Sequence, residues 1–353
     1  SQSSPTGTQF LQAVGCALVC KMGKTKEVVY VSAGEGTTSQ GDFHEALNWA
    51  SNAKAPVIFH IQDNEYAIST HRSEQTASSI YDMTSGYGNL SRYDVDGTDF
   101  FETSLAFKEA VQRARRNKGP SIIVSHVVRL LPHSSSDDQR KYRDEKSLNN
   151  DLKKDPLLIL ESKCIDAKFI KADEFAKIRL QVDKDVDTDS AWAEEQDFPE
   201  PGTAMDHIYS SKEYPEESTF NPVAEKIVIV DAINHALHEE MELNEKMVVY
   251  GQDIADPKGG VFTATKGLSD KFGNGRVFNS PLAESSIVGT AVGMAVSGYK
   301  PVVEIQFGDY IWTAMMQIRN EVATMRYRSN NSWACPMVIR VPVGGYIHGA
   351  LCH

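Results

Sequence analysis

The segment EVVYVSAGEGTTSQGDFHEALNWASNAKAPVIFHIQDN, residues 27–64, contains two short apolar runs separated by a glycine turn and an amphipathic stretch. Residues 27–32 and 56–62 are rich in β-branched and aromatic side chains and are bounded by turn residues, which predicts two buried strands. Residues 42–54 between them predict a helix that Thr38 or Ser39 caps at its start. Because two strands joined by a helix pair in parallel, the segment predicts part of a parallel α/β sheet.

The rest of the chain continues this alternation in two series. After the first pair of strands, the pattern predicts a helix at 102–117, a strand at 121–128, a polar loop at 131–146 and helices within 147–195. Residues 196–221 hold three prolines and many acidic side chains with little apolar periodicity, which is typical of an inter-domain linker. A second series follows, with Asn221-Pro222 as a helix start, strands at 246–251, 301–306 and 336–341, and helices at 284–297 and 309–328. We therefore predict an α/β fold with two domains, residues 1–195 and 222–353, each a mostly parallel sheet flanked by helices.

Charge and composition exclude several classes of protein. The 353-residue chain has a formal net charge of −12, and twelve acidic residues but only two lysines lie between Asp183 and Glu217. An acidic chain repels phosphate backbones, so nucleic acid is not an expected partner. No apolar run approaches the roughly 20 residues that span a bilayer, and no signal peptide is visible, so we expect no membrane contact. The five cysteines form no Cys-x-x-Cys pair, which favours a reducing compartment, either bacterial cytoplasm or an organelle matrix.

A glycine turn follows the first predicted strand. Gly34-Glu35-Gly36 differs from the nucleotide-binding pattern G-x-G-x-x-G, because the third glycine falls at position 41. An acidic side chain beside a phosphate is favourable if a divalent metal lies between them, and Mg²⁺ prefers oxygen ligands shared with phosphates. The next strand ends at Gln62 and is followed by Asp63-Asn64-Glu65-Tyr66, at the same carboxyl edge of the sheet. The sequence therefore predicts a metal–phosphate site at this edge.

The first half of the chain resembles the α subunit of the decarboxylating component of branched-chain 2-oxo acid dehydrogenase. The likeness lies in SSPTGTQFLQAVGCALVCKM, GEGTTSQGDFHEALNWA and YAIST, and in the 26-residue gap between Gly36 and Asp63, which is similar to that of the thiamine-diphosphate motif. The resemblance implies that Mg²⁺ is held by Glu35, Asn64 and the backbone carbonyl of Tyr66. Where the family often has Arg-Asn-Asn-Gly, this chain has Gln62-Asp63-Asn64-Glu65, which removes a phosphate-facing cation and adds two carboxylates.

Residues 246–353 resemble the β subunit of the same enzyme, through SPLAESSIVG, EIQFGDYIW, RYRS and IHGALCH. Glu284 matches the glutamate that activates the cofactor by a hydrogen bond to its aminopyrimidine ring. The loop LPHSSSDDQRKYRD, 131–144, resembles the family's phosphorylation-type loop, so that His133 is expected at the active site and Ser134 matches a serine phosphorylated in relatives. His353 matches a histidine that passes protons during acyl transfer; metal binding by His348 and His353 is disfavoured by their spacing.

The resemblance also implies two sets of binding residues. Thiamine diphosphate is expected to contact Ser4, Thr6, Gly34, Glu35, Gly36, Asn64, Tyr66, Gln306 and Tyr310. A monovalent cation, usually potassium, is expected beside Ser3, Pro5, Thr8 and Gln9.

Together these features predict an oxidoreductase that decarboxylates a 2-oxo acid of the branched-chain type and passes the acyl group to a lipoyl group on a dihydrolipoyl acyltransferase partner. The chain reads as a fusion of α and β subunits that lacks both outer ends of the family pattern, and a homodimer or larger oligomer is expected. Three alternatives stay open: a pyruvate or acetoin dehydrogenase of the same family, more distantly an NAD-dependent dehydrogenase without flavin, and a non-catalytic fragment that takes part only in assembly. The sequence leaves undecided whether Glu35 and Glu284 of one chain share a site.

Overall fold

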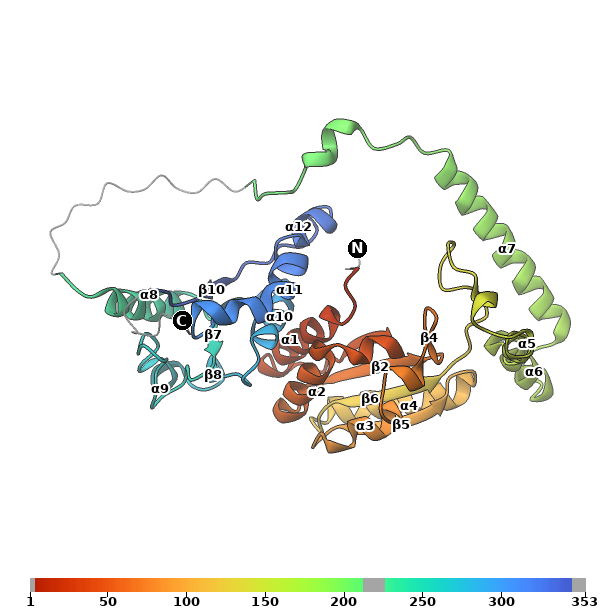
Figure 1. The fold of residues 1–353 in the computed structure, drawn as a ribbon, viewed down its shortest axis with the longest axis horizontal. Coiled ribbons are helices and arrows are strands. Elements are labelled where there is room, and N and C mark those ends of the chain that lie inside the picture. The colour runs from red at the N-terminus through yellow and green to blue at the C-terminus, as the bar shows by residue number, and fades with distance from the viewer. Residues whose placement is uncertain (1–3, 212–225, 345–353) are drawn as a thin grey trace.

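The computed structural model describes residues 4–211 and 226–344 and contains two parallel sheets joined by helices (Figure 1). The first half has helices α1 (Thr8–Met22), α2 (Gly41–Ala53), α3 (Ile80–Met83) and α4 (Phe100–Arg115). Its strands are β1 (Val29–Gly34), β2 (Val57–Asp63), β3 (Tyr66–Ala67), β4 (Thr70–His71), β5 (Ser91–Asp96) and β6 (Ser121–His126). Short 3-10 turns occupy Glu35–Ser39, Arg72–Glu74, Thr84–Gly86 and Gln139–Lys141. The strands pair in the order β1-β2-β6-β5, all parallel, and β3 and β4 form a separate antiparallel hairpin.

The second half contains helices α8 (Ile229–Leu243), α9 (Leu268–Phe272), α10 (Glu284–Val296), α11 (Met315–Gln317) and α12 (Met325–Arg328). Its strands are β7 (Met247–Gly251), β8 (Val277–Asn279), β9 (Lys300–Glu304) and β10 (Val338–Arg340), paired in parallel in the order β10-β9-β7-β8. Along the sequence, the two halves are connected by α5 (Glu145–Leu152), α6 (Pro156–Asp166), α7 (Ala172–Glu194) and a 3-10 turn at Pro201–Met205. Helix α7 runs along the outer side of the molecule (Figure 1). None of the helices in the described ranges is long and apolar enough to cross a membrane.

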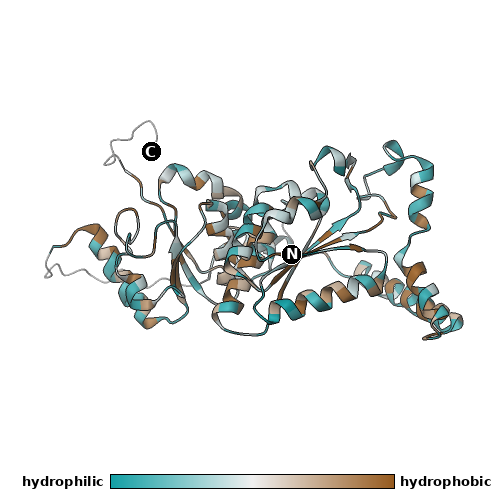
Figure 2. Cartoon of the chain, turned by 90° about the horizontal axis from the view of Figure 1, so that it is seen from below, coloured by the Kyte–Doolittle hydropathy of each residue, from teal (hydrophilic) through white to brown (hydrophobic). Residues whose placement is uncertain are grey.

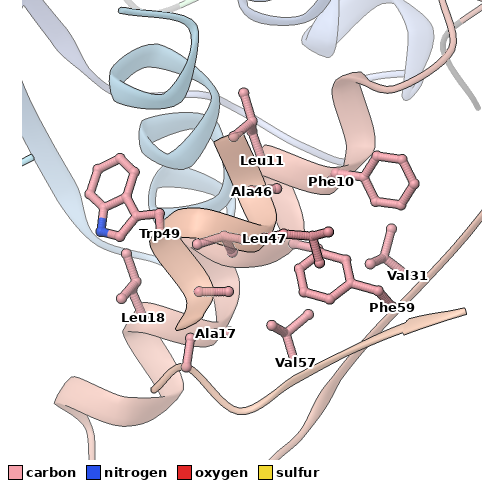
Figure 3. Packing of buried hydrophobic residues seen from close by; sticks show 14 of the residues in the cluster. Phe10, Leu11, Ala17, Leu18, Val31, Ala46, Leu47, Trp49, Val57 and Phe59 are labelled. Atoms are coloured by element: carbon pink, nitrogen blue, oxygen red, sulfur yellow. The ribbon is translucent and has the colours of Figure 1, made fainter. Parts of the chain in front are cut away.

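The main hydrophobic core extends across both halves of the chain. On one face of the first sheet, α1 and α2 bury Phe10, Leu47 and neighbouring side chains against Phe59 of β2 (Figure 3). The same cluster continues into Ile287 and Met294 of α10. Hydrophobic segments accordingly run through both sheets and the helices between them, whereas many of the outer loops and helix turns are hydrophilic (Figure 2). The opposite face of the first sheet is covered by α4 through Ala106 and Ala110.

Helices α1 and α10 approach so closely that their backbones touch. A methyl group added at Gly15 of α1 would lie 2.0 Å from the carbonyl oxygen of Thr290, and one at Gly293 of α10 would lie 2.0 Å from that of Gln12. Cys16 donates a hydrogen bond through Sγ to the Gly293 carbonyl at 3.4 Å. Only glycine permits such a crossing, because any β-carbon would meet the other helix's backbone.

The predicted α/β fold with mostly parallel sheets is confirmed, but several details differ. The helix predicted at 309–328 is wrong, because residues 308–328 form a 3-10 segment (Gly308–Ala314), α11, a π-helical turn (Ile318–Val322) and α12. Its β-branched side chains favour helix weakly, and the buried Gln317 is held by bonds to other helices. The predicted cap of α2 is also wrong: Gln40 occupies that position without a side-chain bond, and the Thr38 hydroxyl donates to the Glu35 carbonyl at 2.7 Å. Strands β5 and β8 were not predicted, and the helix start at Asn221-Pro222 lies outside the described residues.

Candidate active site

Glu35 occupies the turn at the carboxyl end of β1, directly beside the end of β2. Its side chain is only 2% exposed, and burial raises the pKa of its carboxyl above the usual value. One oxygen, Oε2, accepts a 3.4 Å hydrogen bond from the backbone N–H of Asn64, while Oε1 has no hydrogen-bond partner within the described part of the chain. A buried carboxylate oxygen without a donor is costly unless a cation or proton fills the gap. The site therefore fits a metal ion at Glu35.

The glycine turn is packed against the β3–β4 hairpin. A methyl group at Gly36 would lie 2.5 Å from Cβ of Ala67, so glycine is required there by the hairpin. At Gly34 the nearest atom would be 4.0 Å away, so packing does not restrict that position. Of the two predicted glycines, Gly36 is therefore the one that the described contacts require.

Residues 63–66 form a tight turn that carries the other predicted metal ligands and contacts Glu35 through the backbone N–H of Asn64. Asn64 Oδ1 accepts from the backbone N–H of Tyr66 at 3.0 Å, and Glu65 has the left-handed φ of 71° that such a turn needs. Tyr66 opens β3 opposite His71. Among the described residues, no cluster of three or more His, Cys, Asp or Glu side chains could hold a metal. The arrangement offers a carboxylate, an amide and a main-chain carbonyl, which are the oxygen donors that Mg²⁺ prefers.

The additional carboxylates in this turn are paired with an arginine that sequence reasoning missed. Asp63 forms an ion pair with Arg72, and its side chain is 1% exposed. Arg72 Nη2 also lies 3.6 Å from the carboxylate of Glu65, and His126 Nδ1 lies 3.7 Å from Asp63. No pattern in the sequence indicates this ion pair, because it depends on the β3–β4 hairpin that folds Arg72 back onto the turn.

The loop with His133 is connected to the same hairpin. The backbone N–H of His133 donates to Asp137 at 3.0 Å, and the Tyr142 hydroxyl donates to the same carboxylate at 2.6 Å, which lowers the pKa of Asp137. Arg129 donates to the Tyr142 hydroxyl at 2.7 Å and to the Ile68 carbonyl at 2.8 Å. His133 is exposed, so the loop presents its ring to solvent while the loop's base stays joined to the hairpin.

The Tyr66 ring and the polar loop meet at an aromatic and basic cluster. The guanidinium carbons of Arg129 and Arg143 lie 5.5 and 5.2 Å from the Tyr66 ring centroid, and the Tyr142 ring lies 6.1 Å from it. Ser134 is exposed and bonds to Ser136 at 3.1 Å. The predicted exposure of this loop is correct for His133 and Ser134, although Gln139 and Arg143 are buried.

Glu284 is the first residue of α10 and is half-buried. Its Oε1 accepts from Gln252 Nε2 at 3.1 Å and its Oε2 from the Thr313 hydroxyl at 3.0 Å. Both donors were missed, yet Gln252 follows β7 directly, and the carboxyl-edge rule used for Asp63 would have indicated it. Gln306, at the end of the neighbouring strand, donates to Asp253 at 2.6 Å.

Helices α10 and α11 contact the first half of the chain, α11 at the starts of α1 and α2 and α10 at the start of α2. Gln317 Nε2 donates to the Thr8 carbonyl at 3.2 Å and to Asp42 Oδ2 at 2.8 Å. The Ser286 hydroxyl donates to Glu45 Oε2 at 2.7 Å. Burial raises the pKa of the Asp42 and Glu45 carboxyls. The structure thus brings the helix that begins with Glu284 onto α2, which follows the Glu35 turn in the same chain.

The remaining predicted residues are placed as follows. Ser4 and Thr6 are exposed just before α1, and Tyr310 packs on Phe307 with ring centroids 5.4 Å apart. In the expected potassium site, Gln9 accepts from the Gly7 N–H at 3.0 Å and donates to the Ser32 carbonyl at 3.4 Å, and Thr8 donates to the Pro5 carbonyl at 3.5 Å. Both the oxygen and the nitrogen of the Gln9 amide are therefore hydrogen-bonded to the protein's own backbone. Ser3, His348 and His353 lie outside the described residues.

Comparison with known proteins gives matches for both halves of the chain. The dehydrogenase E1 component family matches residues 1–202, and the transketolase pyrimidine binding domain family matches residues 225–352. The β subunit of 2-oxoisovalerate dehydrogenase from Bacillus subtilis (strain 168) is 52% identical over 124 residues, which cover 35% of this chain and 38% of that protein. The α subunit from the same organism is 39% identical over 210 residues, 59% of this chain and 63% of that protein.

A pyruvate dehydrogenase E1 component subunit β from Acholeplasma laidlawii is 46% identical over 127 residues, 36% of this chain and 38% of that protein. The chain therefore spans less than two thirds of the length of each of these relatives. The predicted order of an α-like half followed by a β-like half is confirmed. Since the first family covers more than half of the chain, this protein belongs to the thiamine-diphosphate-dependent dehydrogenase E1 component family.

Proposed function

We propose that this chain forms a thiamine-diphosphate site that decarboxylates a 2-oxo acid, and that it works with an acyltransferase that receives the acyl group on a lipoyl arm. The observation that carries the proposal is that one chain holds two carboxylates suited to the cofactor, on elements that are connected by packing. Glu35 has a buried, unpartnered oxygen, and Glu284 begins a helix that packs on the element following Glu35.

Glu35, the Asn64 amide and the Tyr66 carbonyl would hold Mg²⁺ against the diphosphate. The support is the shared hydrogen bond between Glu35 and the Asn64 backbone, together with the free oxygen of Glu35. Burial keeps water away from the carboxylate, which strengthens its attraction for a cation. Ser4, Thr6, Gly34, Gly36, Gln306 and Tyr310 stay proposed cofactor contacts, and the potassium site at Pro5, Thr8 and Gln9 stays a proposal.

Glu284 would hold a proton against the aminopyrimidine ring. Gln252 and Thr313 each donate to one of its oxygens, so the carboxyl group is fixed in orientation at the start of α10. When bound, thiamine diphosphate supplies the carbon nucleophile and the electron sink that decarboxylation needs. His133, presented by a loop joined to the Tyr66 hairpin, is the proposed group for proton transfer on the substrate side.

Branched-chain 2-oxo acids are the proposed substrates. The support is that named 2-oxoisovalerate relatives match both halves, at 52% identity in the β-like half and 39% in the α-like half. Pyruvate is the second candidate, because pyruvate dehydrogenase β subunits match the second half at 42% and 46%. Decarboxylation rates with 3-methyl-2-oxobutanoate and with pyruvate, measured on the same preparation, decide between them.

The test of the site is calorimetric titration with thiamine diphosphate, with and without Mg²⁺, followed by turnover of the 2-oxo acid with an artificial electron acceptor. We expect saturable binding that requires Mg²⁺ and that Glu35→Gln abolishes. Glu284→Gln should bind the cofactor but turn over at least about 100-fold more slowly, as expected on losing a proton-transfer group. Metal-independent binding, or full turnover by Glu284→Gln, would contradict the assigned roles.

A further inference from the structure

Two buried carboxylates lie next to each other at the carboxyl ends of β1 and β2. Glu35 is 2% exposed and the side chain of Asp63 is 1% exposed. The Asn64 backbone, adjacent to Asp63, donates to Glu35. Two negative charges buried next to each other repel unless cations neutralise them. If a metal ion binds one of the two carboxylates, Glu35 or Asp63, the protein itself has to neutralise the other.

Arg72 neutralises Asp63. It forms an ion pair with Asp63, which also accepts the Glu65 N–H at 3.0 Å, so that both Asp63 oxygens have donors from the protein. Glu35 Oε1 has no such donor within the described residues. Asp63 is therefore already neutralised by the protein, and Glu35 is left for the metal.

Arg72 also closes the loop that carries the other two metal ligands. Its backbone N–H donates to the Glu65 carbonyl at 2.8 Å, and its guanidinium reaches Asp63 at the base of the same loop. Asn64 lies between these two attachment points, and Tyr66 directly follows the second. Both the backbone and the side chain of Arg72 thus restrain the segment in which Asn64 and Tyr66 lie.

The geometry points to Arg72 as the positioning residue of the diphosphate–magnesium site, a role that compensates for the acidic residue at position 63 of this chain. The inference builds on the proposed function, since it assigns the residue that holds the ligands of that site in place. The family pattern often has a neutral asparagine at position 63, which would need hydrogen-bond partners but no charged one. Replacing both Asp63 and Arg72 by neutral side chains of similar size should therefore restore what loss of Arg72 alone removes.

The first readout is hydrogen–deuterium exchange of the peptide covering residues 63–72, measured without cofactor. Arg72→Gln should accelerate exchange of this peptide by about tenfold or more, because it removes the guanidinium that neutralises the buried Asp63 carboxylate. The double variant Asp63→Asn/Arg72→Gln should return exchange to within about threefold of wild type, since neutral partners remove the buried charge. Arg179→Gln is the matched control, because it breaks an arginine–glutamate pair with Glu161 between α6 and α7.

The second readout is the Kd for thiamine diphosphate at saturating Mg²⁺. We expect Arg72→Gln to weaken binding by about tenfold or more and the double variant to recover most of it, with Arg179→Gln unchanged. Unchanged exchange in Arg72→Gln, or a double variant that exchanges as fast as the single one, overturns the positioning role. Should Arg72→Gln fail to fold, the double variant must still fold with wild-type exchange. Absence of cofactor binding by the wild type would count against the proposed function, while the exchange comparison would still decide the role of Arg72.

Discussion

Replacing Gly293 by alanine tests how tightly the two halves of the chain are packed together. The new methyl group would lie 2.0 Å from the Gln12 carbonyl oxygen and 2.8 Å from the Cys16 nitrogen, whereas ordinary contacts begin at 3.4 Å. Both obstacles are backbone atoms of α1, so no side-chain rotation relieves the overlap. Helices α1 and α10 would have to separate by more than 1 Å along this contact, judged from the difference between 2.0 and 3.4 Å.

Overpacking of this kind destabilises a core by about 1–3 kcal/mol, and the backbone overlap places Gly293→Ala at about 3 kcal/mol. The assay is urea unfolding followed by fluorescence, with Gly275→Ala as the control, since a methyl group there meets nothing within 4 Å. Both substitutions remove one glycine from the unfolded chain, so that contribution cancels in the comparison. If Gly293→Ala unfolds at the same urea concentration as Gly275→Ala, the close contact of α1 with α10 does not exist in solution.

Three further predictions concern the site. Burial raises the pKa of the Glu45 carboxyl above its ordinary 4.5, so the folded chain binds this proton more tightly than the unfolded chain, and the free energy of unfolding falls as the pH rises above that value. In thermal unfolding, Glu45→Gln should therefore have a higher midpoint temperature than wild type at pH 8 and should lose this advantage at pH 4. Gly36→Ala would place a methyl group 2.5 Å from Cβ of Ala67, so it should weaken Mg²⁺-dependent cofactor binding by about tenfold and lower the free energy of unfolding by about 1–3 kcal/mol. Unaltered cofactor binding in calorimetry would contradict the packing of the turn on the hairpin. A mixture of Glu35→Gln and Glu284→Gln chains should stay inactive in a turnover assay if, as we propose, one site takes both carboxylates from the same chain; recovery on mixing would instead show a site shared between chains.

Strands with continuous apolar runs are the elements that the sequence predicts best. β2 and β7 lie within one residue of the predicted ranges 56–62 and 246–251, because strands buried on both faces need apolar side chains at every position. β5, with the sequence SRYDVD, lies at the edge of its sheet and is mostly solvated, so its composition does not separate it from a loop. The 309–328 segment is mistaken for one helix because its local pattern is apolar, while its actual course is set by Gln317 bonding to two other helices.

In the candidate site, too, some contacts can be predicted from the sequence and others cannot. The adjacency of Glu35 and Asn64 follows from the rule that neighbouring parallel strands end at the same edge, and the hydrogen bond between them agrees with it. The ion pair of Arg72 with Asp63 depends on a hairpin of two-residue strands, which no periodicity in the sequence reveals. Gln317, which joins α1 and α2 to the second half, is 275 residues from Asp42, and nothing local predicts a contact at that separation.

The contact between α1 and α10 needs both its glycines and its polar bonds. Gly15 and Gly293 allow the two backbones to touch, but a smooth surface of small residues restrains sliding along the helix axes only weakly. The hydrogen bonds from Ser286 to Glu45 and from Gln317 to Asp42 are directional, and the second is buried, so sliding by even one helical turn would leave the Glu45 and Asp42 carboxylates without these donors. Glycines therefore set the distance between the halves and the polar bonds set the register. Because Glu284 lies two residues before Ser286 on the same helix, we expect that register also to position the Glu284 carboxylate relative to α2.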